Sequence, residues 1–279
     1  MIKIDGHTHT ELCPHGTGEK TSLMIERAIR LGFTEYHLTE HAPLPVGFLA
    51  NYAGDPENVK TASLSWDQLD DYFALGRRLQ RKYHDRIKIT VGFEVDYLED
   101  YEEDIRAFLQ KVAPQTANNI ISVHYLKNSA GGYYGIDYSP AELKAGFGDE
   151  LTDVQQLYQR YFRAVLASVQ ADWGAKAIAK IGHMSLIKKY QDYFGLPTDF
   201  SQINMNLVGQ ILEVAQQKKL KLDFNSAGLY KPYCNDLYPG RQIIAQARQL
   251  GIPFEFGSDA HGVSEVGRGY HLFEYLDKN

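Results

Sequence analysis

Short apolar and β-branched runs alternate with amphipathic stretches along the whole chain. Seven runs have the length and composition of strands: residues 2–7, 35–41, 87–97, 118–126, 177–186, 219–224 and 252–261. Apolar residues recur at helical spacing in five stretches between or beside them: residues 21–33, 69–83, 158–170, 206–220 and 238–252. Strands that alternate with helices indicate parallel β/α units. The pattern therefore predicts an α/β fold, and seven such strands favour a (β/α) barrel over an open sheet, although spacing alone does not close the ring.

Two segments are longer than a simple connection between strand and helix requires. Residues 42–68 are rich in Pro, Gly and Asn, as a long functional loop would be, and residues 127–176 begin irregularly before they become helical. We find no internal repeat, low-complexity tract or linker that would divide the chain. The sequence therefore predicts one catalytic domain over residues 1–279, with long insertions near 42–68 and 127–176.

Composition and charge narrow the class of protein. The chain has 279 residues, of which 44% are hydrophobic, which is ordinary for a globular protein with a substantial core. Its net charge of -6 argues against a nucleic-acid partner, and its two cysteines indicate no disulfide framework. Neither a signal peptide nor an apolar run long enough for a membrane span is apparent. We expect a cytoplasmic protein without a membrane partner; the sequence leaves open a homo-oligomer.

Potential metal ligands follow almost every predicted strand. In a parallel barrel the carboxyl ends of the strands face one opening, where active sites are built. Two carboxylates and seven of the chain's ten histidines would meet there: His7, His9, His15, His41, Glu94, His124, His183, Asp259 and His261. Glu40 also ends the second strand, and the sixth strand departs from the pattern with Asp223 followed by Asn225.

Positions without a functional role, at the surface or in the core, account for single histidines but not for this set. We interpret His37 and His84 as surface or satisfied core residues. Seven unpaired imidazoles in one opening would repel one another when protonated, whereas metal ions bind them in the neutral form. At four or five ligands per ion, nine side chains with one bridging carboxylate suit two or three ions. Imidazole and carboxylate ligands favour Zn, Fe or Mn over Ca.

Seven motifs, in order along the chain, resemble one known family. GHTHTELCPHG, LTEHAPLP, GFEVDY, SVHYL, GHMSL, LDFNSAG and FGSDAH are similar to motifs of the polymerase-and-histidinol-phosphatase (PHP) family, and most similar to its stand-alone histidinol-phosphate phosphatases. The resemblance spans residues 1 to about 270. It implies a distorted (β/α)7 barrel, similar to a TIM barrel, with three divalent transition-metal ions (Zn, Fe or Mn) at the carboxyl ends of the strands.

The resemblance also implies how the ligands divide among the three ions. One ion would be held by His7, His9, Glu94 and Asp259, and a second would share Glu94 and add His124 and His183. The third would use His15, His41 and His261. Cys13 lies between candidate ligands but is not a ligand in the family pattern, so we interpret it as a packing residue.

The activity that the resemblance implies is hydrolysis of a phosphate monoester, L-histidinol phosphate, to L-histidinol and phosphate in histidine biosynthesis. A hydroxide between two ions would attack the phosphorus in line. Three residues are candidates for catalysis: Glu94, which would set the spacing of two ions, and Asp259 or His261, which would assist proton transfer to the leaving oxygen.

Four further residues are candidates for substrate binding: Arg160, Arg163, Asn225 and Lys231. A solvated helix face explains the two arginines about twice as well as a phosphate contact, since arginine is mostly exposed. Two positions depart from the family. Ser185 replaces a common acidic residue, and Tyr230 stands where close relatives often have an arginine, which leaves Lys231 as the neighbouring cation.

Two alternatives remain open at this stage. The chain could be a PHP phosphoesterase or nuclease acting on nucleotides or short DNA ends, which its acidic balance and its lack of polymerase segments disfavour. It could also be a non-enzymatic metal-binding scaffold, which would predict a degenerate ligand set, whereas all nine family ligands are present.

Overall fold

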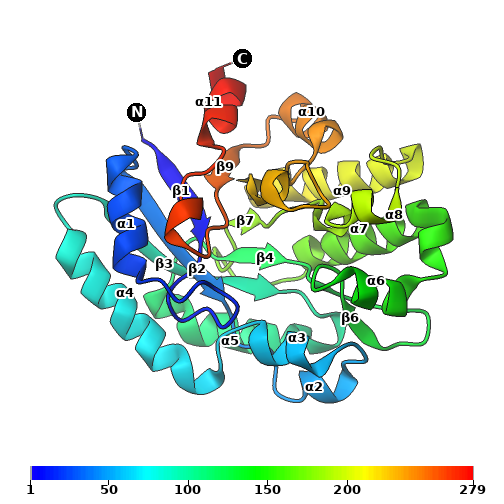
Figure 1. Ribbon diagram of the computed structural model, residues 1–279, viewed down its shortest axis with the longest axis horizontal. Coiled ribbons are helices and arrows are strands. Elements are labelled where there is room, and N and C mark those ends of the chain that lie inside the picture. Colours follow the sequence, from blue (N-terminus) through cyan, green and yellow to red (C-terminus); the bar gives the residue numbers. More distant parts are fainter. Residues whose placement is uncertain (1, 279) are drawn as a thin grey trace.

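Seven parallel strands form the central sheet in the computed structural model, which describes residues 2–278 (Figure 1). These strands are β1 (Ile4–Thr8), β2 (Glu35–His41), β3 (Lys88–Asp96), β4 (Ile120–Ser122), β7 (Lys180–Ile181), β8 (Lys221–Asn225) and β9 (Phe254–Gly257). They are neighbours in the order β1-β2-β3-β4-β7-β8-β9, so each strand pairs with the next one along the chain, apart from a separate hairpin. All six pairings are parallel, which brings the seven carboxyl ends to the same side.

Two backbone hydrogen bonds join the ends of this sheet. The N–H of His9 donates to the carbonyl of Ala260 at 3.0 Å, and the N–H of Asp259 donates to the carbonyl of His7 at 2.9 Å. A parallel bridge between Thr8 and Ala260 lies at the same place. The first and last strands are therefore joined where their candidate ligands begin, and the predicted (β/α)7 barrel is confirmed.

Helices connect the strands and cover the outside of the barrel (Figure 1). The α-helices are α1 (Thr21–Arg30), α2 (Phe48–Asn51), α3 (Pro56–Thr61), α4 (Leu69–Tyr83), α5 (Glu102–Val112), α6 (Pro140–Phe147), α7 (Val154–Gln170), α8 (Gln191–Phe194), α9 (Gln202–Lys218), α10 (Arg241–Gln249) and α11 (Tyr270–Lys278). Short 3-10 helices are η1 (Trp66–Gln68), η2 (Glu99–Tyr101), η3 (Ala113–Gln115), η4 (Glu150–Asp153), η5 (Leu186–Lys188), η6 (Ala227–Tyr230) and η7 (Val263–Glu265).

Helix α4 shows how the amphipathic pattern fixes this arrangement, and its bounds are those predicted. Leu69, Tyr72, Leu75 and Leu79 lie three or four residues apart and are buried along one face of the helix. The hydroxyl of Tyr72 donates to the carbonyl of Leu38 at 3.0 Å, so the buried polar group at its tip is satisfied. The helix is therefore anchored to the barrel by both apolar packing and a hydrogen bond.

The strand predicted over residues 118–126 is divided in two. Strand β4 ends at Ser122, and residues 125–127 form β5 (Tyr125–Lys127), which pairs antiparallel with β6 (Tyr133–Gly135) outside the barrel. The alternating pattern continues through both pieces, so periodicity alone could not separate them. The fifth predicted strand, residues 177–186, has only two residues in strand conformation, because the chain leaves the sheet before His183.

Both predicted insertions carry structure of their own. Residues 42–68 contain α2, α3 and η1, and residues 127–176 contain β6, α6, η4 and α7. A bridge between Tyr52 and Tyr133 joins the two insertions beside the barrel opening. The continuous sheet supports one domain over residues 1–279, and the domain assignment stays a prediction.

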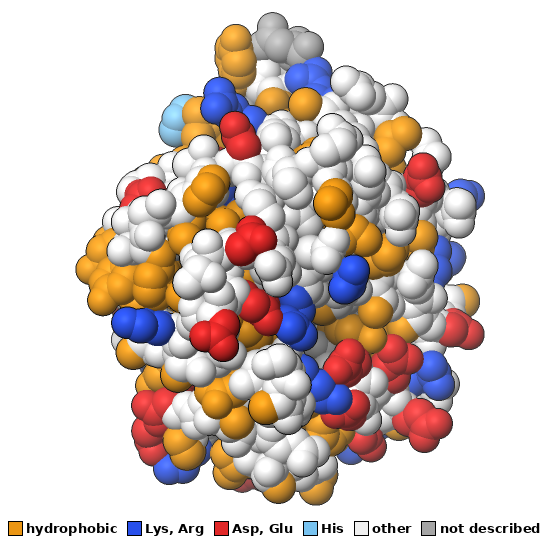
Figure 2. All heavy atoms as spheres, turned by 90° about the vertical axis from the view of Figure 1, so that its right-hand side faces the viewer, with side chains coloured by type: hydrophobic (Ala, Val, Ile, Leu, Met, Phe, Trp, Pro, Cys, Tyr) orange, Lys and Arg blue, Asp and Glu red, His pale blue; other side chains and the backbone are white. Residues whose placement is uncertain are grey.

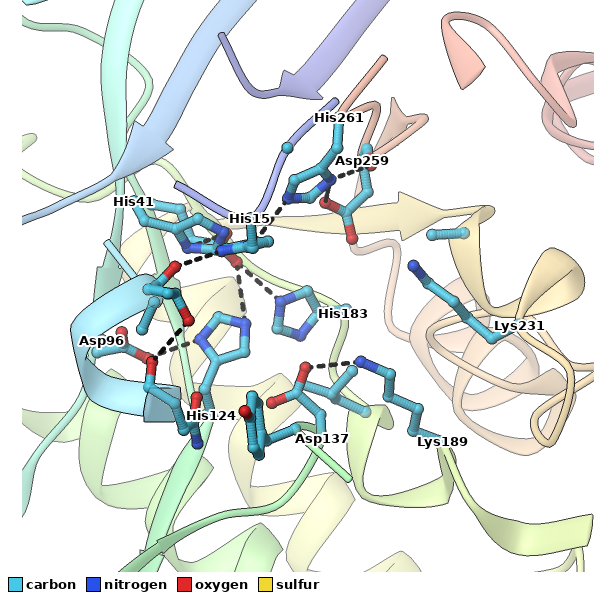
Figure 3. A pocket seen from close by; sticks show the side chains of 18 of the residues that line it. His15, His41, Asp96, His124, Asp137, His183, Lys189, Lys231, Asp259 and His261 are labelled. Carbon is cyan, nitrogen blue, oxygen red and sulfur yellow. Dashed lines mark hydrogen bonds and ion pairs between the residues drawn. The ribbon is translucent and has the colours of Figure 1, made fainter. Parts of the chain in front are cut away.

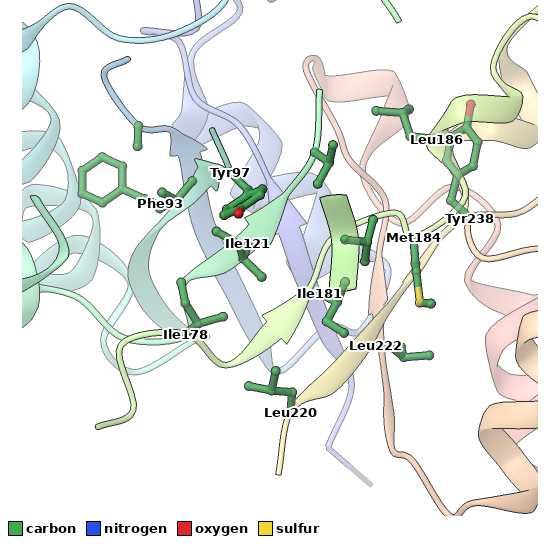
Figure 4. Close-up of a cluster of buried hydrophobic side chains, with 14 of the residues drawn as sticks. Phe93, Tyr97, Ile121, Ile178, Ile181, Met184, Leu186, Leu220, Leu222 and Tyr238 are labelled. Atoms are coloured by element: carbon green, nitrogen blue, oxygen red, sulfur yellow. The ribbon is translucent and has the colours of Figure 1, made fainter. Parts of the chain in front are cut away.

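Apolar side chains pack on the outer face of the sheet, towards the helices. Figure 4 shows Ile121, Ile181 and Leu222, which come from three adjacent strands and are buried together. The inner face carries charged groups, because Lys180, which points to the opposite side from Ile181, contacts both the carboxylate of Glu255 and the carbonyl of Gly6. Burying this ion pair is costly unless its remaining polar atoms are satisfied, and Lys221 provides a further contact to Glu255 at 2.6 Å.

The outer surface carries charges of both signs. On the face shown in Figure 2, acidic and basic side chains are interspersed and no large basic patch is visible. Among the helices that the structure describes, none has the length and apolar character needed to cross a membrane. That the chain has no nucleic-acid partner stays a prediction.

We expect Gly6→Ala to destabilise the protein. A Cβ at this position would overlap the Glu255 carboxylate and lie 2.8 Å from the Lys180 ammonium, so this buried ion pair would have to shift from its present contacts. Overpacking of this kind costs about 1–3 kcal/mol, measurable as a lower free energy of unfolding in urea. Gly209→Ala, within α9, is the control: its Cβ would lie 2.9 Å from Nε2 of Gln246, a partly exposed side chain that can move, so it should stabilise by up to about 1 kcal/mol. Equal unfolding free energies for the two variants would contradict this account.

Candidate metal centre and substrate cavity

The carboxyl ends of the strands open into a cavity of about 450 Å³ (Figure 3). Residues from almost every strand end and from both insertions line it. Those that carry polar side chains include His15, His41, Asn58, Glu94, Asp96, His124, Asp137, His183, Lys189, Lys231, Asp259, His261 and Glu265. The volume suits a small molecule.

Glu94 lies at the centre of the histidines and is 2% exposed. Its Oε1 is 2.8 Å from Nε2 of His183, and its Oε2 is 3.2 Å from Nε2 of His7. The same Oε2 is 3.2 Å from Nδ1 of His41. One carboxylate therefore faces imidazoles from three different strand ends, which is the arrangement that a bridging ligand requires.

Asp259 provides the second carboxylate from an unusual backbone conformation. Its φ of 53° lies in the left-handed region, which few residues other than glycine adopt, although Asp tolerates it better than most. Its Oδ1 is 3.1 Å from Nε2 of His9 and 3.8 Å from Nε2 of His7. Local strain of this kind is often found at functional sites, and here it accompanies a side chain directed at two histidines.

A third group of histidines lies beside the first two. Nε2 of His15 and Nε2 of His261 are 3.1 Å apart, and the ring centroids of His15 and His41 are 5.0 Å apart. Two ring nitrogens this close either share one proton or face one cation. The ring of His9 stacks on that of His261 with centroids 3.9 Å apart, which connects this group to Asp259.

Three further carboxylates orient the histidines from behind. Nδ1 of His7 is 2.7 Å from Asp223, Nδ1 of His9 is 3.1 Å from Glu40, and Nδ1 of His124 is 2.7 Å from Asp96. A carboxylate that accepts the Nδ1–H of a histidine fixes the tautomer in which Nε2 is free to bind a metal.

These orienting residues were only partly visible in the sequence. Glu40 and Asp223 were noted at strand ends without a role, and Asp96 was missed. Asp96 lies two residues after Glu94 and therefore on the same side of β3, and this spacing could have identified it as part of the site.

Charges in the centre are strongly coupled. Burial raises the pKa of the Glu94 carboxyl, but the surrounding histidines, His7 first, outweigh burial and hold this pKa well below its ordinary value. Burial and the neighbouring His9 lower the pKa of His41 and of His261, so these two imidazoles stay neutral. For His124, burial lowers the pKa, but Asp96 and Glu94 outweigh it and raise it to about 10.

The donor atoms fit divalent metal ions. Nε2 of His7, Nε2 of His41 and Oε2 of Glu94 are buried without a hydrogen bond, a costly arrangement that bound cations would relieve. Ligand atoms of Glu94, His124 and His183 lie within 4.8 Å of one another, as do those of His7, His9 and Asp259. In the described chain a further such group joins His41 and His261 to His9 and Cys13. Together these side chains form a site for divalent metal.

The other sequence candidates divide into two groups. Lys231 lines the cavity, whereas Asn225 is buried behind it, where its amide donates to Oδ2 of Asp259 at 3.2 Å. Arg160 and Arg163 do not reach the cavity and instead line a separate cleft, where Arg160 pairs with Glu150. The interpretation of these arginines as substrate ligands is therefore corrected: neither lines the cavity, and Arg160 is held instead by Glu150 and by the carbonyl of Lys127.

A parallel (β/α)7 barrel with imidazoles and carboxylates gathered at its strand ends defines a metal-dependent hydrolase. The chain belongs to the PHP family: residues 5–227 match the PHP domain, and residues 241–278 match the PHP-associated segment. The family inferred from the seven motifs is confirmed.

Relatives extend over the whole chain. A curated histidinol-phosphatase of Bacillus subtilis is 33% identical over 276 residues, which cover 98% of each chain. A crystal structure of a candidate histidinol phosphatase from Listeria monocytogenes superposes with a TM-score of 0.94 at 42% identity, covering 97% of this chain and 100% of that one. Histidinol phosphate phosphatase of Lactococcus lactis, solved with zinc, L-histidinol and phosphate, has a TM-score of 0.69 at 20% identity, covering 98% and 93%, and shows the shared fold.

We expect metal binding to stabilise the protein through Glu94. Addition of Zn²⁺ to metal-stripped protein, at about a thousand times its dissociation constant, should raise the melting temperature by about 8 °C or more. Glu94→Gln should lose most of this rise, because the amide removes the charge that faces three strand ends. The rise should persist in Glu150→Gln, which alters a carboxylate outside the cavity. An equal rise in both variants would show that zinc binds elsewhere.

Proposed function

We propose that this chain is a histidinol-phosphatase that hydrolyses L-histidinol phosphate to L-histidinol and phosphate in the cytoplasm, as a step of histidine biosynthesis. The observation that carries the proposal is the three groups of potential metal ligands gathered beside a cavity of small-molecule size. The similarity to the Bacillus subtilis enzyme, which extends over 98% of both chains, supports this substrate.

Three divalent ions, of Zn, Fe or Mn, would be held by the nine side chains. One set is His7, His9, Glu94 and Asp259. The second shares Glu94 and adds His124 and His183, and the third consists of His15, His41 and His261. When bound, such ions act as Lewis acids that lower the pKa of water and neutralise phosphoryl oxygens.

The chain's own residues orient this chemistry. Glu94 fixes the spacing of the first two sets because its two oxygens face different histidines, His183 through Oε1 and His7 through Oε2. Asp223, Glu40 and Asp96 each hold Nδ1 of their histidine and so direct Nε2 inward, towards the metal site. We assign to Asp259, whose Oδ2 accepts a hydrogen bond from the Asn225 amide at 3.2 Å, or to His261 the orientation of the water that delivers a proton to the leaving oxygen.

We assign binding of the phosphate group to Lys231. Its backbone follows η6 at the edge of the cavity, and Figure 3 shows its ammonium directed across the opening towards Asp259. Within residues 2–278 its side chain makes no hydrogen bond or ion pair, so the cation is available to an anionic ligand. Asn225, by contrast, acts on Asp259 and not on the substrate.

Phosphate release by purified protein of known metal content tests the proposed activity. We expect kcat/KM for L-histidinol phosphate to exceed that for a nucleoside monophosphate or an aryl phosphate by about a hundredfold, since a site that binds the substrate's polar groups rejects analogues that lack them. His9→Ala should lower activity by about a hundredfold or more, because it removes a metal ligand. His84→Ala, at an exposed position, is the control.

Two outcomes would contradict the proposal. A preference for the nucleotide would favour a nucleotide phosphoesterase on the same barrel. Absence of phosphate release from every substrate by metal-loaded protein would favour a metal-binding scaffold.

For Lys231→Met we expect a lower kcat/KM for every phosphate monoester tested, by about ten- to a hundredfold. A hydrogen bond to a charged group contributes about 1.5–3 kcal/mol, and each 1.36 kcal/mol corresponds to a factor of ten. Steady-state kinetics with the three substrates measures this effect. The exposed Lys60→Met provides the comparison, since this lysine pairs with Glu57 at the surface. A loss confined to one substrate would assign Lys231 to the leaving group and not to the phosphate.

A further inference from the structure

A lysine–aspartate pair lies in the cavity apart from the metal ligands (Figure 3). Nζ of Lys189 is 2.9 Å from Oδ2 of Asp137, and the two side chains are 20% and 25% exposed, respectively. Asp137 belongs to the long insertion, between β6 and α6, whereas Lys189 follows η5. Neither residue is used by the chemistry assigned above.

Asp137 differs from the other cavity carboxylates because one of its carboxylate oxygens is free to accept a hydrogen bond. Within the part of the chain that the structure describes, five carboxylates line the cavity. Glu94 and Asp259 lie among the metal ligands. Asp96 holds His124, and Glu265 accepts the backbone N–H of His261 at 2.8 Å. Asp137 is bound only through Oδ2, so its Oδ1 can accept a hydrogen bond from a ligand.

The backbone around Asp137 is fixed relative to the metal centre. The N–H of the preceding residue, Ile136, donates to the carbonyl of His124 at 2.9 Å. The carbonyl of Asp137 itself accepts a hydrogen bond of 2.6 Å from the hydroxyl of Tyr190. The carboxylate is therefore presented from a rigid backbone, which reduces the entropy lost when a ligand binds.

The carboxyl group of Asp137 also stays ionised. Burial raises the pKa of its carboxyl, but the Lys189 ammonium and then His124 outweigh burial and bring this pKa to about 2. The group is thus an anion at any physiological pH. It is suited to attract a cation and unsuited to donate a proton to a leaving group.

We propose that Asp137 is a specificity-determining residue that binds the ammonium group of the substrate, with Lys189 as the residue that positions its carboxylate. This inference rests on the proposed function, because L-histidinol phosphate carries an ammonium group close to its phosphate. The phosphate would lie at the metal centre and Lys231, and the cationic end at Asp137. The cavity would then select phosphate monoesters that carry a nearby amine.

Substrate comparison in Asp137→Asn tests the assignment. The substrates are L-histidinol phosphate, its analogue without the amine (3-(imidazol-4-yl)propyl phosphate) and an aryl phosphate. We expect the variant to lose at least about thirtyfold in kcat/KM for L-histidinol phosphate, chiefly through KM, because a buried charge pair is broken. Activity on the two substrates without an amine should stay within about threefold. The preference for the amine should therefore disappear.

Asp236→Asn is a matched control, because Asp236 forms a similar pair with the adjacent Lys188 at 2.6 Å but does not line the cavity. It should keep the amine preference. Asp137→Glu retains the charge and displaces the carboxylate, so it provides a second test if the Asn variant does not fold. We expect it to keep a reduced preference for the amine, about tenfold below that of the unaltered chain.

Three results would overturn the assignment. Equal losses on all three substrates would give Asp137 a merely structural role, and an unchanged amine preference in both Asp137 variants would place the ammonium elsewhere. If the unaltered protein itself showed no preference for the amine, the proposed function would fail together with this inference. The unaltered protein thus tests the function, and the variants test the residue.

Discussion

A buried carboxylate surrounded by imidazoles is the constraint on which the rest of the structure depends. Glu94 is 2% exposed, and among the described residues ring nitrogens of five histidines lie within 4 Å of its carboxylate oxygens. Such a group is costly to remove from water unless opposite charge surrounds it. The parallel barrel meets this requirement because its geometry directs every strand end to the same point. The closure of β1 onto β9 at Ala260 then brings the first and last ligands together.

Orientation of the ligands requires a further layer of charge, which the barrel also provides. Asp223 comes from β8, Glu40 from β2 and Asp96 from β3, so each histidine that they hold is oriented by a different strand from its own. A displacement of one strand would therefore disturb ligands on its neighbours. This coupling explains why the layers below are also closely fitted, with the Lys180–Glu255 pair packed directly against Gly6, one residue before His7.

The sequence revealed those parts of the site that depend on strand order and residue type. The nine candidate ligands lie at or just beyond the carboxyl ends of predicted strands, and their convergence follows from parallel topology. Contacts made by the insertions could not be found in this way. Asp137 lies in a segment without periodicity, and its position depends on the β5–β6 hairpin, which the continuous pattern of residues 118–126 concealed. Arg160 and Arg163 failed for the converse reason: their charge suggested phosphate binding, but the direction of a helix face is set by packing that charge does not reveal.

The candidate metal ligands and the proposed substrate-binding residue come from different parts of the fold, and they also differ in how readily the sequence predicts them. The candidate metal ligands lie at or just after the carboxyl ends of the strands that define the barrel, and the chemistry proposed for them acts on a phosphate group whatever is attached to it. Recognition of the attached group falls to segments that connect the strands, since loops can vary without disturbing the sheet. The position of Asp137 between β6 and α6 follows this division. With the role proposed for Asp137, the insertion of residues 127–176 supplies the selectivity of this barrel for one phosphate monoester over another.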